Sequence, residues 1–415
     1  MPKAPLVAVT SPLALPSGPA SRPLLLCFSH LRWDFVFQRP QHLLTRAARH
    51  YQVVFFEEPV FEDGVEPELA VSPRDGGVTV AQPRLPSGMS EAMQIAAQRR
   101  MVDSLVAVNG RPAVLWYYAP LAMAFSSHVL AETCVYDCMD ELSAFRNAPP
   151  LLPAMERRLF GRADLVFTGG MSLYEAKRSQ HPRVHGFPSS IDVGHFARAR
   201  SPGRRDPADQ AAIAGPRLGF FGVVDERMDV DLVAAAAALR PDWQFVMIGP
   251  VVKIDPDTLP RLPNLHWLGG KAYADLPDYL GGWDLGFMPF ARNEATRFIS
   301  PTKTPEFLAA GLPVVSTPIT DVVRPYGEKK LVEIAETAEE VVAKAELLLA
   351  RPREAWLARV DRHLSRGSWD RTWDTMHDLI RSAAASRSAQ RDRRERAGGS
   401  SAAASAAVLG GPSHV

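Results

Sequence analysis

Short apolar runs alternate with amphipathic segments along most of the chain. Between residues 23 and 187, the runs LLLCFSH, QVVFFEEP and DLVFTGG predict buried strands, and the stretches between such runs have helical spacing. The alternation starts again near residue 217 with RLGFFGVV, WQFVMIGP and DLGFMPF. Strands that alternate with helices form a mostly parallel sheet covered on both faces. The pattern therefore predicts an α/β protein with two doubly wound, Rossmann-like domains facing a central cleft.

Changes in composition mark the borders of the predicted domains. Prolines interrupt the start of the chain, and the stretch SPGRRDPADQAAIAGP is rich in proline, glycine and charge. The end of the chain is rich in Ala, Ser, Arg and Gly and lacks apolar periodicity. The predicted organisation is a flexible leader over 1–22, an N-terminal domain over 23–200, a linker over 201–216, a C-terminal domain over 217–366, a helix over 367–385 that packs back on the N-terminal domain, and a disordered tail over 386–415.

Three local signals predict where helices begin and end. Ser172 and Glu175 form a capping-box pattern just after a Gly-Gly turn, and Thr337 and Glu340 form a second one. Gly311 follows a short predicted helix, at the position where a residue with positive φ is needed.

Composition and charge exclude several classes of protein. Hydrophobic residues make up 46% of the 415 residues and charged residues 22%, which is a globular composition. The net charge of +1, from 47 basic and 46 acidic residues, argues against a nucleic-acid partner. Three cysteines provide no disulfide framework and fit a reducing compartment. Since no run of about 18 apolar residues exists, we predict no transmembrane helix and expect a cytoplasmic protein.

The segment from Arg297 to Gly327 has the strongest chemical signal. A helix that starts near Thr302 would aim its free backbone N–H groups and positive dipole end into the cleft, which suits an anion such as a phosphate. Ser300 precedes this helix start, and Lys303 in the same turn adds a cation. Glu306, one turn further on, could reach a ribose hydroxyl pair. The alternative is an ordinary helix–strand unit with a surface Lys and Glu.

The same segment, PTKTPEFLAAGLPVVST, resembles the nucleotide-sugar motif of GT-B glycosyltransferases of group 1, family 4-like type. FPSSIDVGHF, LGFFGVVDERMD, FVMIGP, LHWLGGKAYADLPDYL and WDLGFMPF resemble further segments of that family, in the family's order. CFSHLRWDFVFQRPQHLL looks like the opening strand and loop of one bacterial branch. The resemblance spans about residues 23 to 385. It implies a GT-B fold, a nucleotide-sugar donor held by the C-terminal domain, an acceptor held by the N-terminal domain, and transfer with retention of configuration.

The resemblance also implies roles for residues of the donor side. Glu306 matches the second Glu of the family's paired motif, which binds the ribose, whereas Phe298 stands where the first Glu lies near the transferred sugar. Glu294 is acidic but four residues too early to replace it. The family places an Arg and a Lys after the first donor strand, and here Arg227 is the obvious cation for the diphosphate. The other candidate donor-binding residues are Gly222, Gly249, Lys253, Lys271, Arg297, Ser300, Thr302 and Lys303.

On the acceptor side, the strand VYDCMD ends with two carboxylates that could orient and deprotonate an acceptor hydroxyl. Asp140 is the better match to the family's His or Asp at this place, with Asp137 as a second candidate, and the alignment could also slip to Glu141. Alternatively, Asp137 caps a helix or satisfies buried backbone donors. A dense polar and aromatic loop follows the first strand and predicts acceptor binding, or else a packed loop with its tryptophan in the core. Its candidates are His30, Arg32, Trp33, Asp34 and Arg39.

Departure of a nucleoside diphosphate needs either a divalent metal or fixed cations with backbone dipoles. Asp137 and Asp140 lie three residues apart and in the other domain, whereas Arg227 and Lys303 match the cation solution, so we expect no metal and no cofactor. The resulting prediction is a hexosyltransferase (EC 2.4 class) that uses a nucleotide sugar, with uridine as the default base, in cell-envelope or exopolysaccharide synthesis. The acceptor is a carbohydrate or a lipid-linked carbohydrate, and peripheral contact with the cytoplasmic face of the inner membrane stays open. The alternatives are a nucleotide-sugar epimerase on the same fold and a non-catalytic nucleotide-binding relative.

Overall fold

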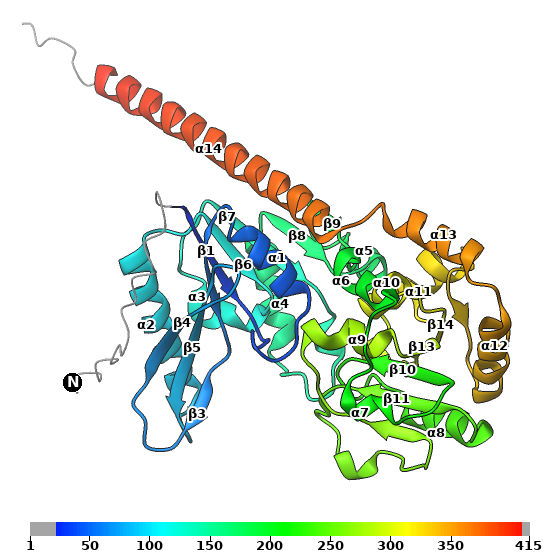
Figure 1. The fold of residues 1–415 in the computed structure, drawn as a ribbon. Coiled ribbons are helices and arrows are strands. Elements are labelled where there is room, and N and C mark those ends of the chain that lie inside the picture. Colours follow the sequence, from blue (N-terminus) through cyan, green and yellow to red (C-terminus); the bar gives the residue numbers. More distant parts are fainter. Residues whose placement is uncertain (1–21, 409–415) are drawn as a thin grey trace, which may run out of the picture.

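The computed structural model describes the backbone of residues 22–408 and the side chains of residues 22–390 (Figure 1). Two sheets, one in each half of the molecule, lie side by side, and a long helix crosses over the N-terminal one. Below, the N-terminal half means residues 22–200 and the C-terminal half residues 217–366. Within the described part of the chain, no helix combines the length and the apolar character needed to cross a membrane. The predicted leader over 1–22 lies outside the described residues except for its last position.

The N-terminal sheet contains nine strands within the described residues, in the order β3-β5-β2-β1-β6-β7-β8-β9, and β4 pairs antiparallel with β5. The other neighbours pair in parallel, with Leu25 of β1 opposite both Val53 and Val114. The strands are β1 Leu24–Phe28, β2 Gln52–Phe56, β3 Val60–Glu62, β4 Glu68–Arg74, β5 Val78–Pro86, β6 Val114–Tyr117, β7 Thr133–Cys138, β8 Leu165–Thr168 and β9 Val184–Gly186.

Helices cover both faces of this sheet, which explains why its central strands are apolar throughout. In β1, Leu24, Leu26 and Phe28 face one hydrophobic core, whereas Leu25 and Cys27 face the other, as the period of two in a strand requires. The helices of this half are α1 Arg39–Ala47, α2 Glu91–Asn109, α3 Met123–Ser126, α4 Leu152–Arg162 and α5 Met171–Lys177, whereas α6 Val193–Ala197, at its end, packs on the core of the C-terminal half.

The C-terminal sheet is parallel and has six strands among the described residues, in the order β12-β11-β10-β13-β14-β15. As predicted, Gly311 has a positive φ of 81° just after α10, and Thr337 caps α12 by accepting from Glu340 N. The strands are β10 Arg217–Phe221, β11 Gln244–Ile248, β12 Leu265–Trp267, β13 Leu285–Met288, β14 Val314–Ser316 and β15 Glu333–Ile334. The helices are α8 Val230–Leu239, α9 Leu276–Leu280, α10 Lys303–Ala309, α11 Thr320–Val322, α12 Ala338–Ala350 and α13 Glu354–Leu364.

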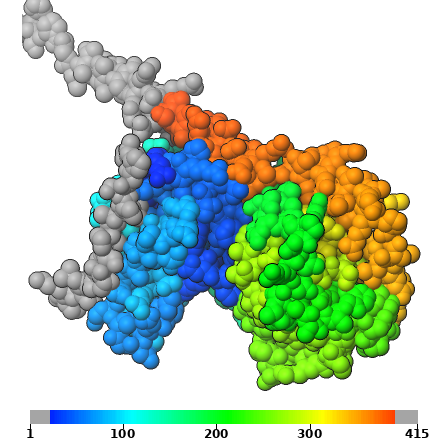
Figure 2. Space-filling view, viewed as in Figure 1, coloured from blue at the N-terminus to red at the C-terminus, as the bar shows by residue number. Residues whose placement is uncertain are grey.

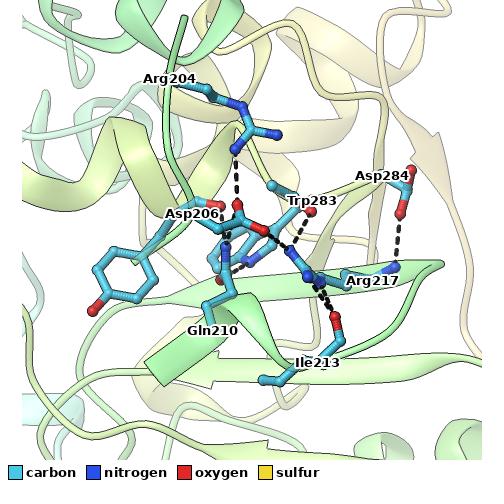
Figure 3. A network of polar contacts seen from close by, with 9 residues as sticks. Arg204, Asp206, Gln210, Ile213, Arg217, Trp283 and Asp284 are labelled. Carbon is cyan, nitrogen blue, oxygen red and sulfur yellow. Dashed lines mark hydrogen bonds and ion pairs between the residues drawn. The ribbon is translucent and has the colours of Figure 1, made fainter. Parts of the chain in front are cut away.

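The stretch predicted as a linker contains a short helix, α7 (Ala208–Ala211), and is fastened to the C-terminal half by the polar network of Figure 3. Asp206 accepts from Arg204 at 2.8 Å and from Arg217 at 2.6 Å. Gln210 joins Tyr279 O to the indole N–H of Trp283. Burial alone would raise the pKa of Asp206, but the hydrogen bonds from Arg217 and Arg204 hold it below its ordinary value. The charges of this stretch thus fix it in place.

The last helix, α14 (Trp369–Val408), packs on the N-terminal sheet. Trp369, Trp373 and Met376 are buried there at helical spacing, and Trp369 stacks on His42 of α1 with ring centroids 4.5 Å apart. The structure differs from the sequence prediction at the far end, because the helix continues to Val408 instead of ending at residue 385. Residues 386–408 contain no proline and many good helix formers, so helix formation continues where the apolar stripe has stopped.

Candidate active site

Two adjoining pockets lie in the groove between the halves, beyond the carboxyl ends of both sheets (Figure 2). We name them the Asp140 pocket and the Glu306 pocket after a residue in each lining, and they share Val36, Gly222, Val223 and Lys303. The polar and glycine residues of the Asp140 pocket include Gln38, Arg39, Asp140, Ser189, Gly222, Arg227, Ser300, Thr302 and Lys303. The Glu306 pocket is lined by, among others, Trp33, Asp34, Phe35, Phe37, Gly249, Pro250, Gly270, Lys271, Tyr273 and Glu306.

Helix α10 begins at the boundary between the two pockets. Thr302 precedes its first residue, Lys303, whose ammonium group binds the Thr302 hydroxyl at 2.9 Å. The same ammonium lies 3.5 Å from Glu306 Oε2 and 4.9 Å from the centre of the Phe221 ring. The sequence prediction that Ser300, Thr302 and Lys303 meet at a helix start beside the cleft therefore agrees with the geometry.

Glu306 is a buried carboxylate with unused hydrogen-bonding capacity. The residue is 5% exposed, and its Oε2 atom has no hydrogen-bond partner among the residues whose side chains are described. Burial raises the pKa of Glu306, and the nearby Lys303 and Thr302 oppose this shift. Because a buried acceptor without a donor costs free energy, this oxygen is prepared to accept hydrogen bonds from a ligand.

Two glycines allow the β10 and β11 ends to approach closely at the floor of the site. Gly222 has φ 146° and Gly249 has φ 153°, conformations that residues with a side chain rarely adopt. A Cβ atom on Gly249 would overlap the carbonyl oxygen of Gly222. The glycine identity at these two predicted donor-side positions is therefore a steric requirement of the backbone.

Arg227 is held at the Asp140 pocket by a residue that the sequence analysis missed. Asp225 is buried, and its carboxylate accepts from Arg227 Nε at 3.0 Å and from Nη2 at 2.8 Å. Arg227 is thereby oriented before any ligand binds. The spacing of two residues between an Asp and an Arg, directly after a strand and its glycine, was the available signal.

The two candidate catalytic carboxylates lie in different environments. Asp137 is fully buried, and Arg39 binds it with Nε at 3.1 Å and Nη2 at 2.9 Å. The third nitrogen of Arg39 donates to Phe187 O, so this ion pair joins β7, α1 and the end of β9 within the N-terminal half. Asp137 is thus engaged by a buried side chain, the Arg39 guanidinium, and the structure shows neither a helix cap nor a backbone donor at its carboxylate among the described residues.

Asp140, in contrast, lines its pocket directly. Its carboxylate makes no hydrogen bond to any residue with a described side chain, and it is half-buried. Burial raises the pKa of Asp140, whereas the positive charges of Arg227, Arg39 and Lys253 oppose the increase. A carboxylate with these properties can accept a hydrogen bond and a proton from a bound hydroxyl group.

The loop after β1 lies at the Glu306 pocket, away from the place expected for acceptor binding. Trp33 and Asp34 line that pocket, although Trp33 is mostly buried with its ring centre 5.1 Å from that of Phe55. Arg32 binds Glu57 at 3.3 Å and Pro59 O at 2.9 Å. Burial lowers the pKa of His30 to about 4, with a smaller contribution from Lys253. The packed-loop alternative thus describes Trp33 and Arg32 best.

Three cations that were predicted to bind the donor lie away from the boundary between the two pockets or are already paired. Lys271 lines the Glu306 pocket and binds Asp209 at 2.6 Å. Lys253 and Arg297 are exposed outside both pockets, 5.1 Å from the ring centres of Phe145 and Phe298 respectively.

Phe298, at the position of the missing first Glu, packs against the core of the N-terminal half. The described residues contain no group of three or more His, Cys, Asp or Glu side chains suited to holding a metal ion.

The C-terminal half is similar to a known protein family. Residues 215–351, which include β10 to β15 and most of the residues around Glu306, match the family model described as glycosyl transferases group 1. This part of the chain is therefore similar to group 1 glycosyltransferases.

The chain is also similar to TuaH of Bacillus subtilis (strain 168), which carries a provisional assignment as a teichuronic acid biosynthesis glycosyltransferase. The two are 29% identical over 238 residues, which cover 52% of this chain and 59% of TuaH, so the match spans little more than half of that relative.

The whole fold is also similar to solved structures, at sequence identities that support the GT-B fold alone. Sucrose-phosphate synthase from Thermosynechococcus elongatus superimposes with a TM-score of 0.66 at 14% identity, covering 88% of this chain and 100% of the other. Anabaena Alr3699/HepE in complex with UDP and glucose gives a TM-score of 0.63 at 12% identity, with 87% and 100% coverage. The predicted fold class, two Rossmann-like units facing a cleft, is confirmed.

Proposed function

We propose that this protein transfers a sugar from a nucleotide-sugar donor, with UDP as its nucleotide, to a carbohydrate or lipid-linked carbohydrate of the cell envelope. The observation that carries the proposal is the buried, partly unsatisfied Glu306 beside Lys303, within a segment that matches group 1 glycosyltransferases. The provisional teichuronic acid assignment of TuaH supports an envelope polysaccharide as the acceptor class.

In this proposal the nucleoside occupies the Glu306 pocket. The ribose hydroxyls donate to the Glu306 carboxylate, which supplies the acceptor that the structure leaves unsatisfied. The base lies between the Gly249-Pro250 turn and Tyr273, with Phe37 of the loop after β1 at the rim. The diphosphate then reaches the shared boundary of the two pockets at Gly222 and Lys303.

The reaction breaks the bond between the sugar C1 and the diphosphate oxygen and forms a bond from C1 to the acceptor oxygen. The leaving UDP carries the negative charge, which Lys303, Arg227 and the backbone N–H groups at the start of α10 stabilise. The acceptor hydroxyl donates its hydrogen bond, and finally its proton, to Asp140. In this scheme a divalent metal has no necessary role, and the anomeric configuration is retained.

A thermal-shift panel tests the donor site. Wild type, Glu306→Ala and the control Glu294→Ala are melted with UDP, GDP, ADP, UDP-glucose and GDP-mannose, with EDTA present throughout. Glu294 is a matched control because its exposed side chain lies outside both pockets.

At a ligand concentration of 100 times Kd, binding should add about 2.7 kcal/mol of stability. We expect a selective shift with the uridine compounds in wild type and Glu294→Ala, and a loss of that shift in Glu306→Ala. Folded wild-type protein that responds to no nucleotide would refute the donor site. Nucleotide binding without release of UDP from any UDP-sugar, in the presence of envelope extracts, would favour the non-catalytic alternative.

A further inference from the structure

The N-terminal end of α5 is capped by a residue from the other half of the molecule. The Asp321 carboxylate, at the start of α11, accepts hydrogen bonds from Met171 N at 2.7 Å and Ser172 N at 3.0 Å. Asp321 is 6% exposed, so this contact is shielded from solvent. The sequence predicted instead that Ser172 and Glu175 would form a capping box, but Gly170 is the N-cap residue and Glu175 binds Arg324 at 2.9 Å.

The packing around this cap leaves room only for glycine. A Cβ atom on Gly170 would overlap Asp321 Oδ2 and lie 2.8 Å from Ser300 Cβ. The neighbouring Ser189 donates its hydroxyl to Ser300 O at 2.7 Å. Ser300 lines the Asp140 pocket, so the interface that includes the cap continues into the candidate active site.

The opposite end of α5 is bonded to the loop that carries Asp140. Lys177, the last residue of α5, is 4% exposed and binds Glu141 at 2.7 Å and Glu156 at 2.9 Å. Glu141 is the direct neighbour of Asp140 along the chain. At the start of α5, a Cβ atom on Gly169 would overlap Met139 O, so both ends of the helix restrain the segment around Asp140.

We propose that α5 links the C-terminal half to the acceptor-side carboxylate, with Asp321 and Lys177 as positioning residues for Asp140. The inference rests on the proposed role of Asp140, and Figure 1 shows α5 at the boundary where it contacts α11. When the halves separate, the first amides of α5 lose their carboxylate acceptor, the helix end loosens, and Lys177 holds Glu141 less firmly. Asp140 is then correctly placed only when the halves are together over a donor, which limits wasteful hydrolysis.

A second contact reaches the same loop directly and restricts its movement from the other side. Glu226 of the C-terminal half accepts from Arg146 N at 3.0 Å, and the side chains of these residues also lie 3.4 Å apart. The loop from residue 139 to 147 is therefore held between α5 and the C-terminal half. This contact remains in variants of Asp321, so their effect on the loop reports on the route through α5.

Hydrogen–deuterium exchange tests the link without requiring the acceptor. The variants are Asp321→Ala, the conservative Asp321→Asn and Lys177→Met. Arg324→Ala is the matched control, because it removes an exposed ion pair between α5 and the turn that directly follows α11. We expect Asp321→Ala and Lys177→Met to speed exchange at least fivefold in peptides covering residues 138–147, with a smaller increase in Asp321→Asn. Wild-type exchange is expected in Arg324→Ala.

Kinetics provide the second readout, as UDP released from UDP-glucose with water as the acceptor. We expect Asp321→Ala and Lys177→Met to lower kcat at least tenfold while the KM for UDP-glucose changes less than twofold. The double variant should be no worse than the more impaired single one, because both changes break one route. If the two changes acted only by destabilising the fold, each would lower the melting temperature, and the losses in kcat of the two single variants would multiply in the double variant.

Different results would overturn the α5 link and the proposed donor site. Unchanged exchange over residues 138–147 in folded Asp321→Ala and Lys177→Met overturns the link, even if wild type turns over its donor. Conversely, a wild type that binds no nucleotide overturns the donor site, and the exchange result still decides whether α5 restrains the loop. If Asp321→Ala does not fold, Asp321→Asn and Lys177→Met decide the question.

Discussion

Replacing Glu306 by Gln should change stability and nucleotide binding in opposite directions. The carboxylate is buried, its pKa is raised by that burial, and Oε2 accepts no hydrogen bond from the described side chains or backbone. An acid whose pKa is raised on folding costs stability as the pH rises above its pKa in the unfolded chain, because the native state then binds more protons. At pH 7, Glu306→Gln removes the cost of burying this charge but also its ion pair with Lys303, and we expect a net gain of about 1 kcal/mol.

The same change replaces the charged acceptor proposed for the ribose by a neutral amide with one oxygen acceptor. Hydrogen bonds to a charged group contribute about 1.5–3 kcal/mol and those to a neutral group about 0.5–1.5 kcal/mol, so we expect Kd for UDP to rise roughly 5- to 12-fold. Calorimetric titration with UDP, and thermal melts without it, measure the two effects on one preparation. A gain of 1 kcal/mol should raise Tm by about 2–4 °C for domains of this size. A variant that melts below wild type and binds UDP as tightly would refute the assigned role.

Three further predictions concern other parts of the site. Asp140→Asn should lower transfer by roughly 100-fold or more without changing the Kd for UDP. Because burial raises the pKa of Asp140, wild-type activity should fall on acidification at a pH above the range in which an ordinary Asp titrates. A pH–rate profile that falls only in the ordinary Asp range would contradict this prediction. Gly249→Ala should cost about 3 kcal/mol or more and abolish UDP binding, since its Cβ overlaps Gly222 O; a denaturant melt equal to wild type would disprove the steric argument. Burial, and to a smaller extent the nearby Arg46, lowers the pKa of His42 to about 3. The free energy of unfolding should therefore fall as the pH drops from 6.5 towards 3, and His42→Leu should reduce this slope by up to about 1.4 kcal/mol per pH unit. The same slope in urea melts of wild type and His42→Leu would be evidence against this prediction.

The sequence predicted features that depend on neighbours along the chain. The two alternating sheets, the α10 start beside the cleft and the positive φ of Gly311 all follow from periodicity or from a single turn. The position of Glu306 one turn into α10 could be predicted because its motif is local as well, whereas its role towards a ribose stays a prediction. In these cases the physical cause and the sequence signal occupy the same few residues.

Features that join distant residues were missed or misassigned. Asp321 caps α5 across 150 positions, and Arg39 neutralises Asp137 across 98, so no local pattern reveals either contact. The local capping-box pattern at Ser172 was overridden by the buried carboxylate from the other half. The helical tail shows the opposite error, because intrinsic helix propensity extends α14 beyond its apolar contacts.

The most direct test of the account is a crystal structure of the protein with UDP, grown in the presence of EDTA. The account predicts ribose hydroxyls within hydrogen-bond distance of Glu306, the diphosphate between Gly222 and Lys303 with Arg227 near its outer phosphate, and the base beside Tyr273. It also predicts that the Asp321 cap on α5 is intact in that complex. A nucleotide bound elsewhere, or absent from both pockets at millimolar UDP, would contradict the central claim.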